Sequence, residues 1–332
     1  MKILKKLVIG LIILLIGLAL SGATYQWLAE RSDRQNFPAP GSLYSIDGLQ
    51  LHLDCRGTGS PVVILEAGLT SGSLSWDLVH DPIAAFTRVC AYDRPGLDWS
   101  EPMDHPAGAE EVADRLHRLL NAAEVSGPRI LVGMSAGGVY VREFYRRHPN
   151  NVVGMVLVDS SHEQQGMRLP QPEGEQTFRR MLALCTWLQP LGVVRAFNVL
   201  DGQLSQYEIP ADLRARLSAR MNQSHTCAVI QDETTGFATE VRDMEPPASL
   251  GSLPLVVLSQ GKKPEANEQF GITEAFAIAQ FAQWQIMQQE LVALSSNSRH
   301  LVAERSGHVI QFEQPELVVS AITDLVKELH TP

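Results

Sequence analysis

The sequence has no basic surplus. It carries 27 lysines and arginines against 37 aspartates and glutamates, a net charge of −10, with no long run of one sign. A nucleic-acid-binding surface usually leaves a basic stripe, so we expect no nucleic acid partner. The four cysteines form no Cys-x-x-Cys pair, which argues against zinc and thioredoxin-type sites. Since no metal-ligand spacing and no phosphate-cradling glycine loop is present either, we expect no metal and no cofactor.

The longest apolar run stands at the N-terminus. Residues 7–23 contain no charge, three lysines precede them, and Tyr25 and Trp27 follow. A membrane-spanning helix needs about 20 apolar residues, and residues 7–28 supply that length. The lysines favour a cytoplasmic N-terminus, and the aromatic residues are typical of a membrane interface. We expect a single-pass anchor over residues 1–29 with the rest of the chain outside the cytoplasm; a signal peptide cleaved near Ala23 is the alternative.

Beyond a polar linker over residues 30–40, short apolar runs alternate with helical patterns. Several runs are nearly continuous and rich in β-branched residues, as expected for strands buried on both faces. This alternation predicts an α/β fold with a mostly parallel sheet covered by helices. The expected strands are 49–55, 61–66, 87–92, 129–133, 152–159, 254–259 and 301–304, and the expected helices are 110–123, 137–148, 275–294 and 315–329.

Two stretches depart from this alternation. From Leu43 to Glu66 no helix separates the strands, and we expect antiparallel strands at the edge of the sheet. Residues 162–249 contain no clear strand, and apolar residues recur on one helical face over 178–188. The sequence therefore predicts a core of residues 41–161 and 250–332, interrupted by a helical cap of residues 162–249.

The sharpest motif is Gly133-Met134-Ser135-Ala136-Gly137, which follows an expected strand and begins an expected helix. That is the context of a nucleophile elbow. The turn is so tight that Gly133 and Gly137 are needed to avoid steric collisions, and it lifts the serine hydroxyl above the sheet. We interpret Ser135 as a catalytic nucleophile.

A serine hydroxyl needs a base, and His308 is the best placed of the ten histidines. It follows the last expected strand. The carboxyl ends of parallel strands share one edge of the sheet, so Ser135 and His308 are expected to meet there. His162 also lies at this edge but precedes the insertion, and it is the weaker candidate.

Acyl transfer also needs donors for an oxyanion. The backbone N–H of Ala136, directly after the nucleophile, is one expected donor. The N–H of Leu69, in the loop after the strand 61–66, is the other, because Gly68 lets the chain bend toward the site.

Five segments resemble, in order, the motifs of α/β-hydrolases. They read LEAGL (65–69), YDRPGLDWS (92–100), GMSAG (133–137), VDSSH (158–162) and SGH (306–308). The likeness is strongest to membrane-anchored bacterial α/β-fold hydrolases. It implies an eight-stranded, mostly parallel sheet and the chain order serine, acid, histidine. The serine at 135 distinguishes the chain from epoxide hydrolases and haloalkane dehalogenases, whose chemistry needs a carboxylate nucleophile.

Two residues depart from the pattern of these relatives. Ala67 stands where many have histidine, which bears on the second oxyanion donor. Asp98 replaces a glycine in the loop after the fourth strand. Aspartate tolerates a left-handed backbone better than most residues, so we expect that loop to survive.

Two carboxylates compete for the acid of the triad. Many relatives have an aspartate after the seventh strand, but this chain has Pro264 there, followed by Glu265. Asp159 ends the sixth strand, a position that some dehalogenase-like relatives use. A carboxylate there would orient the histidine and stabilise its protonated form. We favour Asp159 as the acid and keep Glu265 as the alternative. If Asp159 is not catalytic, its role is structural, as a cap at the end of the strand where the chain enters the insertion.

The resemblance implies a serine hydrolase that cleaves carboxylic esters or related acyl substrates through an acyl-enzyme. Lactonases and amidases use the same triad, and a non-catalytic ligand-binding or receptor protein on this scaffold is the alternative from another class. The expected partners are a small acyl substrate and, through residues 7–28, a membrane. Because the second and fourth strands of this fold are neighbours, a Cys55–Cys90 disulfide is geometrically reasonable, and four buried free thiols are the equal alternative. Cys185–Cys227 is a weaker prediction.

Overall fold

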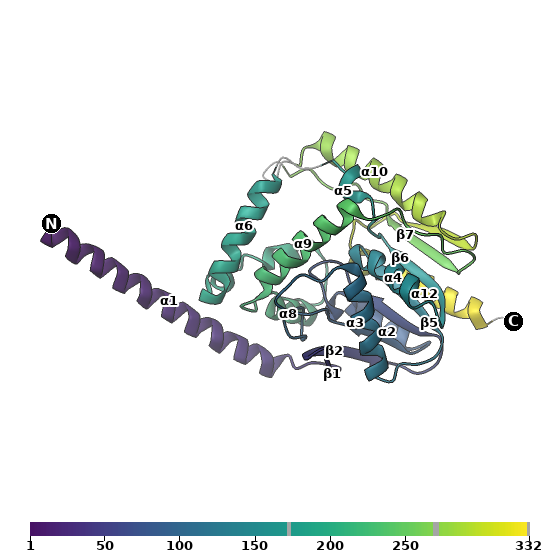
Figure 1. Cartoon of the computed structure of the whole chain (residues 1–332), viewed down its shortest axis with the longest axis horizontal. Helices are drawn as coiled ribbons and strands as arrows, with labels where there is room; N and C mark the ends of the chain where they lie inside the picture. The colour runs from purple at the N-terminus through teal and green to yellow at the C-terminus, as the bar shows by residue number, and fades with distance from the viewer. Residues whose placement is uncertain (171–173, 268–271, 331–332) are drawn as a thin grey trace.

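The protein is built around one eight-stranded sheet (Figure 1). The computed structural model describes residues 1–170, 174–267 and 272–330. The strand order is β1-β2-β4-β3-β5-β6-β7-β8; β2 pairs antiparallel with β1 and β4, and all other neighbours are parallel. The strands are β1 (Ser42–Ile46), β2 (Leu49–Arg56), β3 (Val62–Glu66), β4 (Val89–Tyr92), β5 (Arg129–Met134), β6 (Val152–Val158), β7 (Leu255–Gln260) and β8 (Ser298–Ala303). The predicted α/β architecture is confirmed.

Helices cover both faces of the sheet because its central strands are apolar on both sides. On one face, α3 (Ala109–Ala122), α4 (Ala136–Arg147) and α10 (Glu274–Val292) pack against the strands through residues such as Leu119 and Phe144. On the other face, α2 (Asp77–Ala84) and α12 (Pro315–His330) contribute residues such as Ile83 and Ile322. The sheet is thus a rigid middle layer whose carboxyl edge carries the loops described below.

The expectation of an antiparallel edge from Leu43 to Glu66 is only partly right. β1 and β2 do form an antiparallel hairpin at the edge. β3, however, lies between β4 and β5 and runs parallel to both. All five of its residues are buried, whereas β1 is largely exposed. A fully apolar strand belongs in the middle of a covered sheet, and this burial outweighs the short connection to β2.

Both expected disulfides are present. Cys55 of β2 lies directly opposite Cys90 of β4, and the two are bonded. Cys185 and Cys227 form the second bridge, which joins two helices of the insertion.

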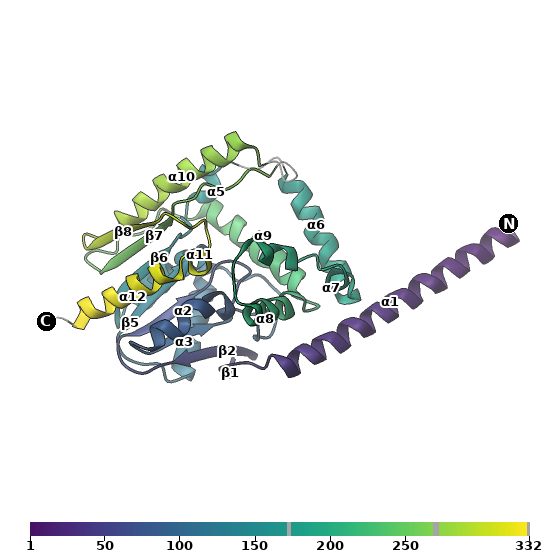
Figure 2. The ribbon, with the colours of Figure 1, turned by 180° about the vertical axis from the view of Figure 1, so that it is seen from behind.

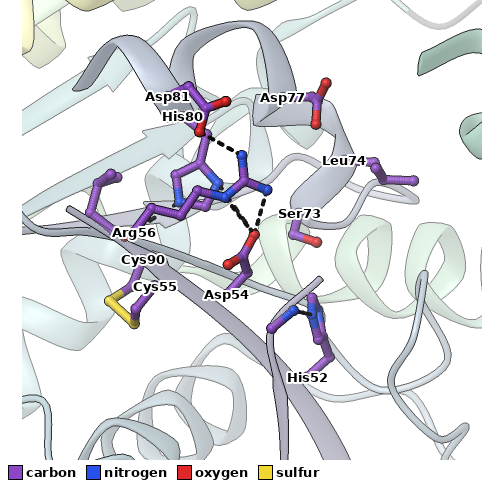
Figure 3. A network of polar contacts seen from close by, with 12 residues as sticks. His52, Asp54, Cys55, Arg56, Ser73, Leu74, Asp77, His80, Asp81 and Cys90 are labelled. Atoms are coloured by element: carbon purple, nitrogen blue, oxygen red, sulfur yellow. Dashed lines mark hydrogen bonds and ion pairs between the residues drawn. A yellow bond between two sulfur atoms is a disulfide. The ribbon is translucent and has the colours of Figure 1, made fainter. Parts of the chain in front are cut away.

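A polar network beside the first disulfide ties the sheet edge to α2 (Figure 3). The Arg56 guanidinium donates to Asp54 through Nε at 2.9 Å and Nη2 at 2.6 Å. Its Nη1 reaches Asp81 of α2 at 2.8 Å. The buried ring of His80 lies next to the same Asp54 carboxylate. The network therefore joins β2 to the first helix of the core.

The insertion between β6 and β7 is helical, and no β-strand occurs among its described residues. Its elements are α5 (Gln165–Arg168), α6 (Glu175–Leu188), η2 (Gln189–Leu191), α7 (Val193–Ala196), η3 (Asp201–Gln206), α8 (Ala211–Met221) and α9 (Thr226–Asp243). They lie over the carboxyl edge of the sheet (Figures 1 and 2).

The N-terminal helix α1 (Lys2–Asn36) is longer than the expected anchor, because residues 30–36 of the expected linker are helical. By length and composition it is apolar enough to cross a membrane. Its first half projects away from the rest of the protein (Figures 1 and 2). Its second half packs on the insertion, where the buried Gln26 donates to the carbonyl of Asn222 at 2.6 Å and Glu30 accepts from the N–H of Ser224 at 2.6 Å.

Candidate active site

Ser135 sits in a sharp turn between β5 and α4. Its backbone has φ 51° and ψ −124°, a left-handed conformation that costs free energy in a non-glycine residue. Side chains at 133 and 137 are sterically excluded: a Cβ on Gly133 would lie 2.4 Å from the carbonyl oxygen of Gly137, and one on Gly137 would lie 2.5 Å from that of Glu66. The two glycines thus permit the turn, as the motif predicts.

The side chain of His308 connects Ser135 to a carboxylate. His308 follows β8, and its Nε2 lies 3.0 Å from Ser135 Oγ. Its Nδ1 lies 2.5 Å from Asp159 Oδ2, at the end of β6. The three residues come from three parallel strands whose carboxyl ends meet at one edge, as expected from the topology. Serine, imidazole and carboxylate therefore form one continuous hydrogen-bonded line.

Hydrogen bonds to the other carboxylate oxygen, Oδ1, hold Asp159 in place. Oδ1 accepts from the backbone N–H of Gln260 and from Nε1 of Trp284, each at 2.9 Å. The residue is fully buried, and the Trp284 ring meets the His308 ring edge to face with centroids 5.6 Å apart. The carboxylate is therefore fixed by three donors, with Oδ2 aimed at His308.

Glu265, the alternative acid, lies elsewhere. It is exposed on the loop after β7, and among the described residues the carboxylate that contacts His308 is that of Asp159. Pro264, which precedes it, lines the cavity above Ser135.

The two residues expected to supply the oxyanion donors, Ala136 and Leu69, both lie beside Ser135. Ala136 begins α4 directly after Ser135, and Leu69 lines the same cavity as Ser135 and His308. Gly68 lies against the nucleophile, since a Cβ there would be 3.2 Å from Ser135 Cβ. Among the described residues, neither N–H donates a hydrogen bond outside the regular helices and strands.

A buried arginine holds the loop that carries Leu69. Arg94 donates from Nη2 to the carbonyl of Gly68 at 2.6 Å and from Nη1 to that of Ala67 at 2.9 Å. Glu233, on α9 of the insertion, accepts from Arg94 Nε at 2.8 Å and from the N–H of Thr70 at 2.6 Å. The loop is thus clamped between the core and the insertion.

This clamp sets the direction of one peptide group. In a trans peptide, the N–H of Leu69 points away from the carbonyl of Gly68, which Arg94 binds. Burial alone would lower the pKa of Arg94, but the carboxylates of Glu233 and Glu66 outweigh it and raise that pKa well above its ordinary value. The guanidinium therefore stays charged where it holds the loop.

A cavity of about 340 Å³ lies over Ser135 and His308. Leu169, Phe237, Phe281 and Trp284 give it an apolar wall, and Gln165, Gln260 and Gln280 add polar groups. Several of its lining residues come from the insertion. A second hollow of about 420 Å³ shares Leu69, Phe237 and Gln280 with it and extends to Arg179 of α6.

Sequence reasoning did not identify three of the residues that surround the site. Arg94 stood within a recognised segment, but its partner Glu233 lies 139 positions away in the insertion. Trp284 is a lone tryptophan on an expected helix, and nothing in the local pattern marks it as a partner of Asp159. Such long-range pairings become visible only when the helices are placed on the sheet.

A parallel sheet covered by helices, with a serine at a strand–helix elbow and a histidine after the last strand, defines the α/β-hydrolase fold. Residues 62–321 match the model of the alpha/beta hydrolase family. The match covers well over half of the 332 residues, and the chain belongs to this family.

Three known proteins show the range of the similarity. An uncharacterized protein of Schizosaccharomyces pombe is 28% identical over 82% of this chain, and the alignment spans 56% of that protein's own length. A thermophilic esterase from Thermogutta terrifontis aligns with a TM-score of 0.62 at 21% identity, over 87% of this chain and 98% of the esterase. A membrane phospholipase A aligns with a TM-score of 0.60 at 18% identity, over 99% of this chain and 100% of the phospholipase. At these identities the two solved structures show the fold.

Proposed function

We propose that the protein is a serine hydrolase that cleaves carboxylic esters through an acyl-enzyme, with Ser135, His308 and Asp159 as its catalytic triad. The observation that carries this proposal is the line from Ser135 Oγ through His308 to Asp159, with contacts of 3.0 and 2.5 Å. Family membership supports hydrolysis, and the Thermogutta protein that shares the fold is an esterase.

The proposed triad accounts for each proton transfer when an acyl group passes from the ester to water. His308 Nε2 accepts the proton of Ser135 Oγ as that oxygen attacks the ester carbonyl, and the Asp159 carboxylate stabilises the imidazolium that forms. His308 then donates the proton to the leaving alcohol oxygen. Water attacks the acyl-enzyme in the second half, giving its proton to His308, and the acid departs as Ser135 Oγ is reprotonated. The chain's own side chains complete the cycle.

The negative charge on the carbonyl oxygen needs donors that are in place beforehand. We assign this role to the N–H groups of Ala136 and Leu69. The Arg94 and Glu233 contacts make Leu69 a fixed donor, because the peptide plane cannot rotate without breaking them. Glu233 belongs to α9, so the insertion acts both as a cap that shapes the acyl pocket and as a support for the oxyanion loop.

We further propose that α1 anchors the enzyme in a membrane, with the N-terminus cytoplasmic and the hydrolase domain outside. The apolar part of α1 is unburied, whereas residues near Gln26 and Glu30 pack on the cap. The membrane phospholipase A aligns over 99% of this chain, so the overlay includes α1. Release of a soluble protein beginning near Thr24 would instead identify the segment as a cleaved signal.

A substrate panel tests the proposed chemistry. The full-length protein is assayed with esters of increasing acyl length, a lactone and an anilide, beside Ser135→Ala as control. We expect ester hydrolysis to have the highest kcat/KM and the variant to lose more than about a thousandfold in rate. Binding of these acyl compounds without turnover of any of them would instead identify a ligand-binding protein.

A further inference from the structure

The cap exposes several large hydrophobic side chains on α6 and on the residues that follow α7. Twelve large hydrophobic side chains are exposed outside residues 1–36 in the described part of the chain, and six of them lie between residues 178 and 199. These six are Phe178, Met181, Leu184, Trp187, Phe197 and Val199. Trp187 and Phe197 are 79% and 76% exposed. Large exposed apolar side chains that are concentrated in one segment of a domain are typical of interaction sites.

The charge of this segment is opposite to that of the protein. Residues 176–200, which we call the apolar cap segment, contain no aspartate or glutamate and three arginines, in a chain with a net charge of −10. Aromatic and aliphatic side chains combined with arginines are the composition of surfaces that lie in a membrane interface. Anionic headgroups attract such basic segments.

The contacts between α1 and the cap determine where the apolar cap segment lies relative to the membrane span of α1. Residues at positions 22, 26, 30 and 33 of α1 recur on one helical face and meet the cap. At the first of these, Gly22, a Cβ would lie 2.2 Å from the carbonyl oxygen of Leu191 in η2. At the last, Asp33 pairs with Arg195 of α7 at 2.8 Å. Gly22 is the second-last residue of the uncharged run 7–23, so η2 and its neighbours lie near the level where that run ends.

The orientation of α6 agrees with this depth. In both views α6 runs across the direction of α1, and one end of α6 lies beside α1 (Figures 1 and 2). Figure 2 shows α7 at the same place. A helix roughly perpendicular to a span that runs along the membrane normal lies along the membrane plane. Trp187 and Phe197 stand four residues before and six residues after Leu191, on either side of the contact with α1.

We infer that the apolar cap segment rests on the bilayer that α1 spans and opens the catalytic cavity toward it. The hollow that adjoins the Ser135 cavity is lined by Arg179 of α6, so the route to the serine begins beside this segment. The substrate is then an acyl ester that resides in the membrane. The inference rests on the proposed hydrolase function and on the proposed anchor.

Tryptophan quenching tests the docking without any need for activity. The full-length protein is placed in vesicles of phosphatidylcholine and phosphatidylglycerol, with and without brominated phosphatidylcholine. The difference between wild type and Trp187→Phe isolates the emission of Trp187, and Trp27→Phe gives the matched reference at the expected interface. We expect bromolipid to quench Trp187 about as well as Trp27. Quenching of Trp187 by aqueous iodide and not by bromolipid would overturn the inference.

A second assay tests access to the substrate. The double variant Trp187→Gln/Phe197→Gln is compared with wild type on a long-chain ester in the same vesicles and on a water-soluble short-chain ester. We expect the rate on the long-chain ester, divided by the rate on the short-chain ester, to fall several-fold in the double variant. The control is Phe86→Gln, at a side chain on the core that is 56% exposed, and it should leave this ratio unchanged. An unchanged ratio in the double variant refutes membrane access. If wild type cleaves neither ester, the hydrolase proposal fails, while the quenching result still decides the docking.

Discussion

Replacing Asp159 with asparagine separates the carboxylate's charge from its shape. Asparagine tolerates the positive φ of 41° at this position nearly as well as aspartate, so the backbone strain does not change. The Gln260 N–H and the Trp284 Nε1–H both donate to Oδ1. They will keep the amide oxygen of the asparagine on their side, because turning the amide would leave two buried donors facing an NH₂ group.

This orientation places the amide NH₂ against His308 Nδ1. The ring must then accept at Nδ1 and carry its proton on Nε2, which faces Ser135 Oγ at 3.0 Å. A protonated Nε2 cannot take the serine proton. The equivalent change in a serine protease lowers kcat about 10⁴-fold by the same tautomer effect. We expect a loss of that order here, about 5 kcal/mol of activation free energy.

The assay is steady-state hydrolysis of the best ester from the panel, with thermal unfolding measured in parallel. Asp159→Asn should unfold near the wild-type temperature and keep a similar KM. Glu265→Gln is the matched control on the exposed loop, and it should keep wild-type turnover. If Asp159→Asn keeps most of its activity while Glu265→Gln loses it, the acid of the triad is Glu265 and the reasoning from the Oδ1 contacts is refuted.

Three further predictions follow from the surroundings of the site. Glu233→Gln should lower kcat up to about tenfold with little change in KM, because it loosens a single oxyanion donor. Complete removal of such a donor typically lowers kcat by about 10²–10³-fold. An equal rise in KM would point to a role in binding instead. Burial raises the pKa of Asp98 to about 7. In the unfolded chain an aspartate has a pKa of about 3.9. Protonated Asp98 therefore adds to the free energy of unfolding at low pH, and this contribution is lost as the pH rises through 7. Asp98→Asn should raise the unfolding temperature more at pH 8 than at pH 5. Gly137→Ala should destabilise the fold by about 1–3 kcal/mol in urea titrations, since its Cβ would overlap the Glu66 carbonyl.

The sequence predicted the residues whose positions depend on strand order alone. Ser135 and His308 each follow an apolar strand, and parallel strands bring their carboxyl ends together without further information. Asp159 was favoured for the same reason. The choice over Glu265 needed the tertiary structure, because Pro264 and its neighbours in sequence give no sign of the donors that Gln260 and Trp284 supply.

Other features depended on contacts that no local pattern shows. Residues 30–36 are polar and were expected to form a linker, yet Glu30 and Asp33 continue the helix because the cap supplies partners for them. β3 was expected at the edge with its hairpin neighbours, and complete burial of its five residues placed it at the centre. In both cases tertiary packing decided between structures that the local sequence allowed equally.

The central claim is that Ser135 is a nucleophile activated by His308. The most direct measurement is labelling of the full-length protein with a fluorophosphonate probe, followed by mass mapping of the modified peptide. We predict one adduct, on Ser135, that disappears in Ser135→Ala and forms far more slowly in His308→Ala. An adduct on another residue, or unchanged labelling of Ser135→Ala, would contradict the account.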